Sequence, residues 1–140
     1  MIANRQDAKS AKREPDHTLD DLARGVIGAA IEVHRHLGPG YLESVYQEAL
    51  AVELRLRGIP FEPQKPISID YKGTKAGEGR LDFLIDGRLI TELKAVDTIA
   101  PIHKAQVISY LKAMDLQLGL LINFNTTLLK DGIQRIVLTT

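Results

Sequence analysis

Cysteine is absent from the 140 residues of this chain. Without thiols the protein has neither disulfide bonds nor thiolate metal ligands, which excludes a stapled secreted scaffold and a cysteine-based zinc site. No apolar run approaches the roughly 20 residues that are needed to span a bilayer. The N-terminus also lacks the apolar segment of a secretory signal. These absences predict a cytoplasmic protein without membrane association.

Aromatic residues and an excess of charge are also missing. Tryptophan is absent, aromatic residues make up 5% of the chain, and 18 basic residues are balanced by 18 acidic ones. A base-stacking platform needs aromatic side chains, and a dedicated nucleic-acid binder usually has a basic excess, so both features argue mildly against DNA or RNA as a partner. They do not exclude it, because a bound metal and a local basic face can supply a positive field.

The residues that are present suit one globular domain. Hydrophobic residues account for 44% and charged residues for 26%, which are ordinary values for such a domain. Residues 1–17 show no apolar periodicity and predict a flexible N-terminal tail. A single folded domain is therefore expected over residues 18–140.

Apolar periodicity and turn residues predict the order helix, helix, three strands, helix, two strands. Thr18 is expected to cap the first helix, Gly58 to end the second, and Pro101 to lie in the first turn of the third. This order favours an α/β fold with one central mixed sheet. The expected helices begin near residues 18, 42 and 98, and the expected strands are 67–71, 116–124, 133–138 and a hairpin over 79–94.

The hairpin over residues 79–94 contains an Asp-Gly turn signal and is apolar enough for the middle of a sheet. It nevertheless carries Asp82, Glu92 and Lys94. Because an unpaired buried charge costs several kcal/mol, roughly, we expect these groups to act together. A two-residue loop would place Asp82 on the face opposite to Glu92. We therefore predict a three-residue loop with Gly87 in the left-handed conformation, or a β-bulge.

Two carboxylates and an ammonium group on one sheet face combine oxygen ligands with a positive charge. Mg²⁺ or Mn²⁺ prefers such oxygens and keeps several waters, one of which can attack a phosphodiester. Lys94 can orient that water or stabilise the pentavalent phosphorus. The alternative is a surface salt bridge between Lys94 and either acid, because isolated Glu-x-Lys tripeptides are common.

Helical residues can complete such a site. Gln106 and Tyr110 share a helix face that we expect to pack toward the sheet, where they either bind a phosphate, a water or the lysine or form a core-edge pair. Glu43 either favours the dipole of the second helix or is a further metal carboxylate. His103 either edges the site or is solvated.

Glu32, His34 and His36 suggest a second metal cluster, which helical geometry opposes. A helical His-x-His places its two rings about 200° apart, so they cannot bind one ion together. We expect all three residues at the surface.

A family resemblance strengthens the interpretation of these residues. Gly40, Glu43 and Tyr46 form a Gly-x-x-Glu-x-x-Tyr motif. With it, the chain resembles the GxxExxY family, a branch of the PD-(D/E)XK nuclease superfamily, over about residues 19–137. Segments that also carry the resemblance are 30–34, 37–40, 92–96, Gln106 with 110–112, and 119–124.

The resemblance implies a restriction-endonuclease-like core, in which a mixed four-stranded sheet flanked by helices cradles a Mg²⁺ site. It also assigns roles to individual side chains. The motif Asp is Asp82, the Glu-x-Lys is Glu92 and Lys94, the helical acid is Glu43, and the Gln-x-x-x-Tyr element is Gln106 and Tyr110.

The leading hypothesis is a phosphodiesterase that acts on DNA with Mg²⁺ or Mn²⁺. Asp82 and Glu92 would bind the metal, Glu43 would assist, and Lys94 would position the water. The alternative is a non-catalytic accessory module that keeps the fold and binds nucleic acid or a protein, and hydrolysis of RNA or nucleotides is a third possibility. A homodimer would suit a nuclease that cuts two strands.

Overall fold

The computed structural model describes residues 17–139, so the tail expected over residues 1–17 lies outside the described residues except for His17. Thr18 lies inside the first helix rather than at its N-cap, and its Oγ1 accepts a hydrogen bond from Arg88 Nη1 at 3.2 Å. The elements follow the expected order with one added 3₁₀ turn. They are α2 (His17–Leu37), α3 (Glu43–Leu56), β1 (Phe61–Tyr71), β2 (Thr74–Ile85), β3 (Leu89–Lys94), α4 (Pro101–Met114), β4 (Leu118–Asn123), η1 (Leu129–Gly132) and β5 (Ile133–Val137).

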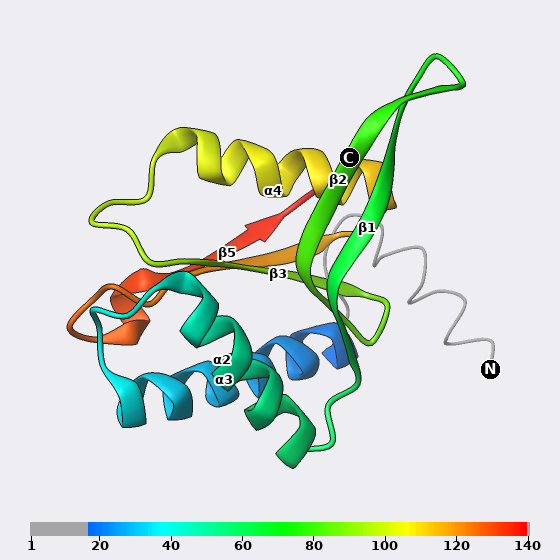
Figure 1. Ribbon diagram of the computed structural model, residues 1–140. Helices are drawn as coiled ribbons and strands as arrows, with labels where there is room; N and C mark the ends of the chain where they lie inside the picture. The colour runs from blue at the N-terminus through cyan, green and yellow to red at the C-terminus, as the bar shows by residue number, and fades with distance from the viewer. Residues whose placement is uncertain (1–16, 140) are drawn as a thin grey trace.

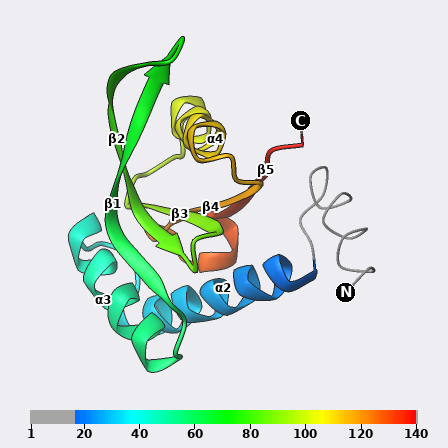
Figure 2. The ribbon, with the colours of Figure 1, turned by 90° about the vertical axis from the view of Figure 1, so that its right-hand side faces the viewer.

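The strands form one five-stranded sheet in the order β1-β2-β3-β4-β5. All neighbours are antiparallel except β3 and β4, which are parallel because the chain crosses over through α4 between them. Helices α2 and α3 cover one face of the sheet and α4 covers the other (Figures 1 and 2). The expected α/β fold with a central mixed sheet is confirmed, with five strands where the resemblance implied four.

Two hydrophobic clusters lie on opposite faces of the sheet. The larger one, under α2 and α3, buries Tyr46, Phe83 and Phe124, and the smaller one, under α4, buries Val107 and Leu111. None of the helices in residues 17–139 is long and apolar enough to cross a membrane.

Helix α4 packs on the sheet through a face other than the expected one. Val107 and Leu111 are buried, whereas Ile102, Gln106 and Ala113 are exposed. The close approach of Val107 requires a glycine on β4, because a Cβ at Gly119 would lie 2.7 Å from Val107 Cγ1. The expected packing against the sheet is therefore wrong for Ile102, Gln106 and Ala113, and of that face only Tyr110 packs against the smaller cluster.

The β2–β3 hairpin has the predicted three-residue loop. Ile85 pairs with Leu89, which leaves three residues between the strands. Gly87, the central one, has a φ of 67° in the left-handed region. The same register, continued one pair past the end of the ladder, sets Asp82 opposite Glu92.

Strands β1 and β2 extend beyond the rest of the sheet as a two-stranded arm (Figure 1). The arm ends in a turn at Lys72 and Gly73, which both have positive φ values, 50° and 82°. Pro63 and Pro66 lie in the edge strand β1, where a missing backbone N–H is tolerated.

Candidate active site

The backbone ladder between β2 and β3 opens at Asp82 and Glu92, beyond its last pair. The backbone N–H of Asp82 donates to Glu92 Oε2 at 2.7 Å, and the backbone N–H of Leu93 donates to Asp82 Oδ2 at 2.8 Å. Each carboxylate thus binds an amide of the opposite strand. The two acids lie next to each other as a result.

Two glutamines, one on α3 and one on β1, also form hydrogen bonds with Asp82. Gln47 Nε2, on α3, donates to the Asp82 carbonyl oxygen at 3.3 Å. On β1, the ladder skips the pair that Gln64 would make with Asp82, and Gln64 has a φ of 50°, which is uncommon outside glycine. Burial raises the pKa of Asp82, and a hydrogen bond from the Gln64 side chain is one of the weaker effects that oppose it.

Sequence reasoning did not find either glutamine as a site residue. The only signal for Gln47 is its place on the Glu43 face of the second helix. Gln64 lies between two prolines in the sequence and carries no signal, because its role depends on a backbone conformation that residue type does not reveal.

Lys94 lies near these acids without touching them. Its positive charge lowers the pKa values of Glu43, Asp82 and Glu92. Within residues 17–139 it forms no ion pair at 4 Å or less. The alternative of a simple Lys94 salt bridge is therefore not observed, and the lysine acts on the carboxylates through its charge alone.

Burial makes the acids of this site hard to ionise. Burial, together with the negative charges of Asp82 and Glu43, raises the pKa of Glu92 to about 8 against the opposing effects of the Asp82 amide and Lys94. Burial is also the largest cause of the raised pKa of Asp82 and of Glu43. A cation between the carboxylates would favour their ionised forms, so the site fits a bound metal electrostatically.

The number of side chains that could bind one ion directly limits which metal the site can hold. The described part of the chain contains no group of three His, Cys, Asp or Glu side chains that could hold one ion. Glu43 is close enough to interact electrostatically with Asp82 but does not complete a set of three direct ligands. Mg²⁺ is commonly held by one or two carboxylates, with waters and substrate phosphate filling the remaining positions, and the Asp82–Glu92 pair fits this pattern.

Tyr46 explains the spacing of the Gly-x-x-Glu-x-x-Tyr motif. Its buried hydroxyl donates to the Gly38 carbonyl at 2.6 Å and accepts from the Tyr41 backbone N–H at 3.2 Å. Gly40, between them, has a φ of 109°, which suits glycine. These bonds tie the loop to α3 and fix where the helix begins, which places Glu43 beside the β2–β3 opening.

A family model described as the PD-(D/E)XK nuclease superfamily matches residues 20–136. The chain belongs to this superfamily. The mixed sheet with helices on both faces agrees with that fold. No curated protein and no solved structure matches the chain. Its place in the GxxExxY branch stays a prediction.

The α4 residues expected in the site, Gln106 and Tyr110, form no hydrogen bond or ion pair with Asp82, Glu92 or Lys94 within residues 17–139. Gln106 is exposed, and half-buried Tyr110 packs against β2, where a Cβ at Gly79 would lie 2.8 Å from its ring. His103 has a local role, because its Nδ1 accepts the backbone N–H of Ala100 at 3.0 Å at the start of α4.

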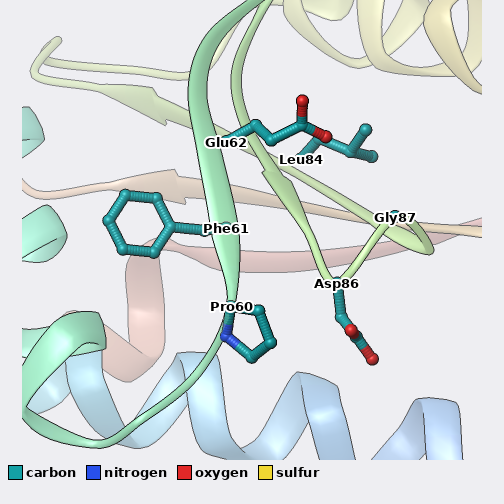
Figure 3. A pocket seen from close by; sticks show the side chains of 6 residues that line it. All are labelled: Pro60, Phe61, Glu62, Leu84, Asp86 and Gly87. Atoms are coloured by element: carbon teal, nitrogen blue, oxygen red, sulfur yellow. The ribbon is translucent and has the colours of Figure 1, made fainter.

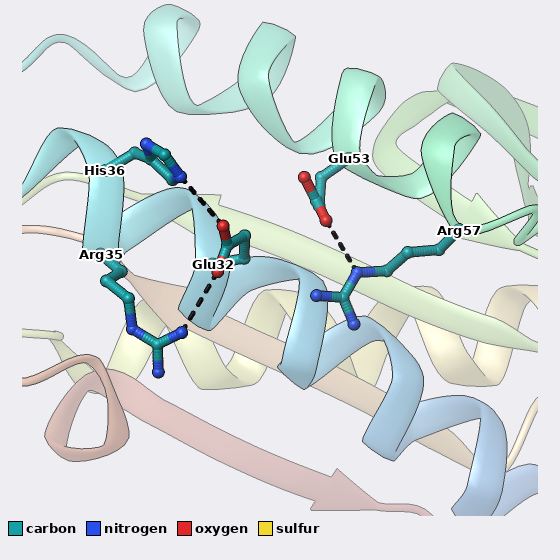
Figure 4. A network of polar contacts seen from close by, with 5 residues as sticks. All are labelled: Glu32, Arg35, His36, Glu53 and Arg57. Carbon is teal, nitrogen blue, oxygen red and sulfur yellow. Dashed lines mark hydrogen bonds and ion pairs between the residues drawn. The ribbon is translucent and has the colours of Figure 1, made fainter.

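The two histidines near the end of α2 have different surroundings and do not contact Asp82 or Glu92. His34 is buried, and its Nε2 donates to the Thr126 carbonyl at 2.8 Å, so the expectation that it lies at the surface is wrong. The ring also lies near the core residue Phe124. His36 is exposed, and its Nε2 contacts Glu32 at 2.9 Å (Figure 4).

Two surface cavities are lined by residues other than the Asp82–Glu92 pair. One, of about 460 Å³, is lined by the end of α2 and by η1. Neither cavity is lined by Asp82, Glu92 or Lys94. The other cavity, of about 250 Å³ beside the β2–β3 turn, is lined by Pro60, Phe61, Glu62, Leu84, Asp86 and Gly87 (Figure 3).

Proposed function

We propose that this protein is a nuclease that hydrolyses DNA phosphodiester bonds with Mg²⁺ or Mn²⁺. The observation that carries the proposal is the reciprocal pair of hydrogen bonds that holds the Asp82 and Glu92 carboxylates beside each other. Superfamily membership supports the reaction class. The raised pKa values of both acids support a cation as their natural counter-charge.

Asp82 and Glu92 are the proposed metal-binding residues. A bound divalent ion supplies a Lewis acid and a water of lowered pKa to such a site. Lys94 presents its ammonium group to the same space, where it stabilises negative charge on the phosphate or orients the attacking water. Glu43 is proposed to hold a water through a hydrogen bond rather than to bind the ion directly, because no three-ligand group is found in the described residues.

Gln106 and Tyr110 are proposed to contact the substrate. The exposure of Gln106 and its position one helical turn from Tyr110 favour a phosphate that approaches from solvent over a contact with Lys94. The neutral net charge of the chain means that the metal and Lys94 would provide the local attraction for nucleic acid.

The decisive experiment is cleavage by purified protein with Mg²⁺, Mn²⁺ or a chelator. Double-stranded, single-stranded and supercoiled DNA, together with RNA, would be offered as substrates. We expect metal-dependent cutting of DNA that Lys94→Ala reduces by at least about a hundredfold. Lys104→Ala, which removes an exposed lysine on α4, is the matched control. Undiminished cutting by Lys94→Ala would contradict the assignment, and cutting of RNA alone would replace DNA with RNA as the substrate.

The competing function is a non-catalytic module that binds nucleic acid or a protein. The equal numbers of acidic and basic residues favour it, because no basic excess directs the chain to a target. Titration with Mg²⁺ and Mn²⁺ separates the two proposals. Absence of metal binding together with absence of cleavage would support the module. The cytoplasmic location stays a prediction.

A further inference from the structure

An apolar stripe runs along the outer face of α3. Leu42, at the N-cap, is followed by Val45, Ala49, Val52 and Leu56 at intervals of three and four residues, which keeps the four helical residues on one side of the helix. Leu42 is 77% exposed, Val52 51% and Leu56 76%. We refer to these five residues as the α3 stripe. The outward face of a surface helix is normally polar, so the stripe indicates a missing partner.

The core contacts of α3 use the opposite side of the helix. Tyr46, Leu50 and Leu54 are fully buried in the larger hydrophobic cluster. Figure 2 shows α3 at the outer edge of the molecule, on the other side of the sheet from α4. The helix is thus apolar on two sides. Ala49, at the margin of the stripe, also packs against the larger cluster, whereas Leu42, Val52 and Leu56 are exposed.

The two flanks of the α3 stripe differ in how their charges are paired. On the flank toward α2, Arg57 Nε donates to Glu53 Oε2 at 2.9 Å (Figure 4). The guanidinium group of Arg57 extends over α2, where a Cβ at Gly28 would lie 3.1 Å from its Nη1. The charges of Glu53 and Arg57 on this flank are therefore paired with each other within the chain.

The other flank carries one acid and one base, seven residues apart. Glu48 and Arg55 are both exposed, and neither forms an ion pair within the described residues. The Arg55 guanidinium lies 5.4 Å from the Phe61 ring, which leaves its charge available at the surface. Glu48 and Arg55 can therefore pair with Arg55 and Glu48 of a second α3 helix that runs antiparallel to the first.

We propose that the α3 stripe binds the α3 stripe of a second copy of this chain, with the two helices antiparallel about a two-fold axis. In this arrangement Val45 packs against Leu56 of the second copy, and Ala49 against Val52 of the second copy. Each of these contacts occurs twice, as a two-fold interface requires. The interface is thus apolar along its centre.

The charges select the antiparallel direction. It brings Glu48 near Arg55 of the second copy, and Arg55 near Glu48 of the second copy, which gives two opposite-charge pairs. A parallel pair would set Glu48 against Glu53 of the second copy, because heptad positions that flank the seam face each other in that way. Two carboxylates would then repel. The surface is self-complementary in one direction only.

The expected dimer is weak. A helix of 14 residues is about 21 Å long, and one such helix pair buries less than the roughly 1,200 Å² of a standard interface. We therefore expect a dimer that dissociates on dilution through the micromolar range. This inference does not depend on the proposed nuclease activity.

Sedimentation of the full chain over a range of concentrations tests the proposal. We expect a monomer–dimer equilibrium that Val52→Glu or Leu56→Glu shifts to monomer. Ile102→Glu is the matched control, because Ile102 is 70% exposed but lies on α4. All three positions are exposed, so thermal unfolding should confirm that each variant folds. A wild-type chain that stays monomeric at high micromolar concentration would overturn the proposal, as would stripe variants that dimerise like the wild type.

Charge reversal tests the direction of the helices. Glu48→Arg and Arg55→Glu should each weaken the dimer several-fold, and the double variant should restore it. Failure of the double variant to recover would overturn the antiparallel arrangement. DNA cleavage is measured in the same samples, because loss of cleavage in an intact dimer would contradict the proposed function and leave this inference standing.

Discussion

The two sides of β2 behave differently along the same strand. Against β1, β2 keeps its backbone ladder over nearly its whole length, whereas against β3 the ladder ends at Phe83 and Thr91. At Asp82 it lacks a ladder pair on either side and is held by side chains instead. One strand thus provides a rigid, fully paired segment at residues 83–85 and a chemical group at Asp82, where the pairing stops.

A substitution of Phe83 tests whether the segment of β2 that is paired on both sides carries the stability. Phe83 is fully buried under α2 and α3, in edge contact with Phe61. Phe83→Ala should lower the free energy of unfolding by about 3–5 kcal/mol, because it removes core contacts and leaves a cavity. Denaturant unfolding measures the change. A loss as small as that of an exposed substitution, below about 0.5 kcal/mol, would show that this segment does not carry the stability.

The dependence of stability on pH tests the role of Glu92, which lies where the β2–β3 ladder has ended. In metal-free protein its pKa is raised to about 8, so between about pH 4.5 and 8 the folded chain binds a proton that the unfolded chain has released. The free energy of unfolding should therefore fall as pH rises through this window, and the raised pKa of Asp82 acts in the same direction.

The pH effect is measured as thermal unfolding in the presence of a chelator. Glu92→Gln removes the titrating group while its amide oxygen can still accept the Asp82 N–H, so this variant should show a flatter pH profile and a higher melting temperature near pH 8. An identical slope in wild type and variant would contradict the assignment. Mg²⁺ should recover part of the wild-type loss above neutral pH.

Substitution of Gln64 should have the smallest effect on stability and should act mainly on metal affinity. Gln64→Gly removes the side chain while it relieves a left-handed backbone, so we expect unchanged or slightly higher stability, by up to about 1 kcal/mol. Affinity for Mn²⁺ should nevertheless fall several-fold, because Asp82 loses a hydrogen bond that orients it. Gln64→Asn, which tolerates the same backbone, should recover part of the affinity if its shorter amide reaches Asp82. Equal affinity in all three proteins would make Gln64 a structural residue only.

The sequence predicts those parts of the fold that depend on local chemistry. Periodicity predicts the order of helices and strands, and the requirement that Asp82 and Glu92 share a face predicts the loop length. The packing face of α4 was predicted incorrectly, because that helix has apolar residues on several sides and Gly119 on a distant strand decides which side approaches.

The candidate site shows the same division between local and long-range information. Asp82, Glu92 and Lys94 are visible in the sequence because charge within an apolar hairpin is costly. Gln47 and Gln64 were missed, because their contacts with Asp82 span 35 and 18 positions of the chain. The burial of His34 depends on a loop 92 residues away.

The three-residue loop between β2 and β3 has a consequence for how this protein tolerates change. Because side chains alternate along a strand, shortening the loop by one residue would invert the parity of β3 relative to β2. Deletion of Arg88 would then direct Glu92 and Lys94 toward the larger hydrophobic cluster and Leu93 toward α4. Many substitutions in this turn should be harmless, whereas a change of its length by a single residue would dismantle the site while every residue of it remained in the chain.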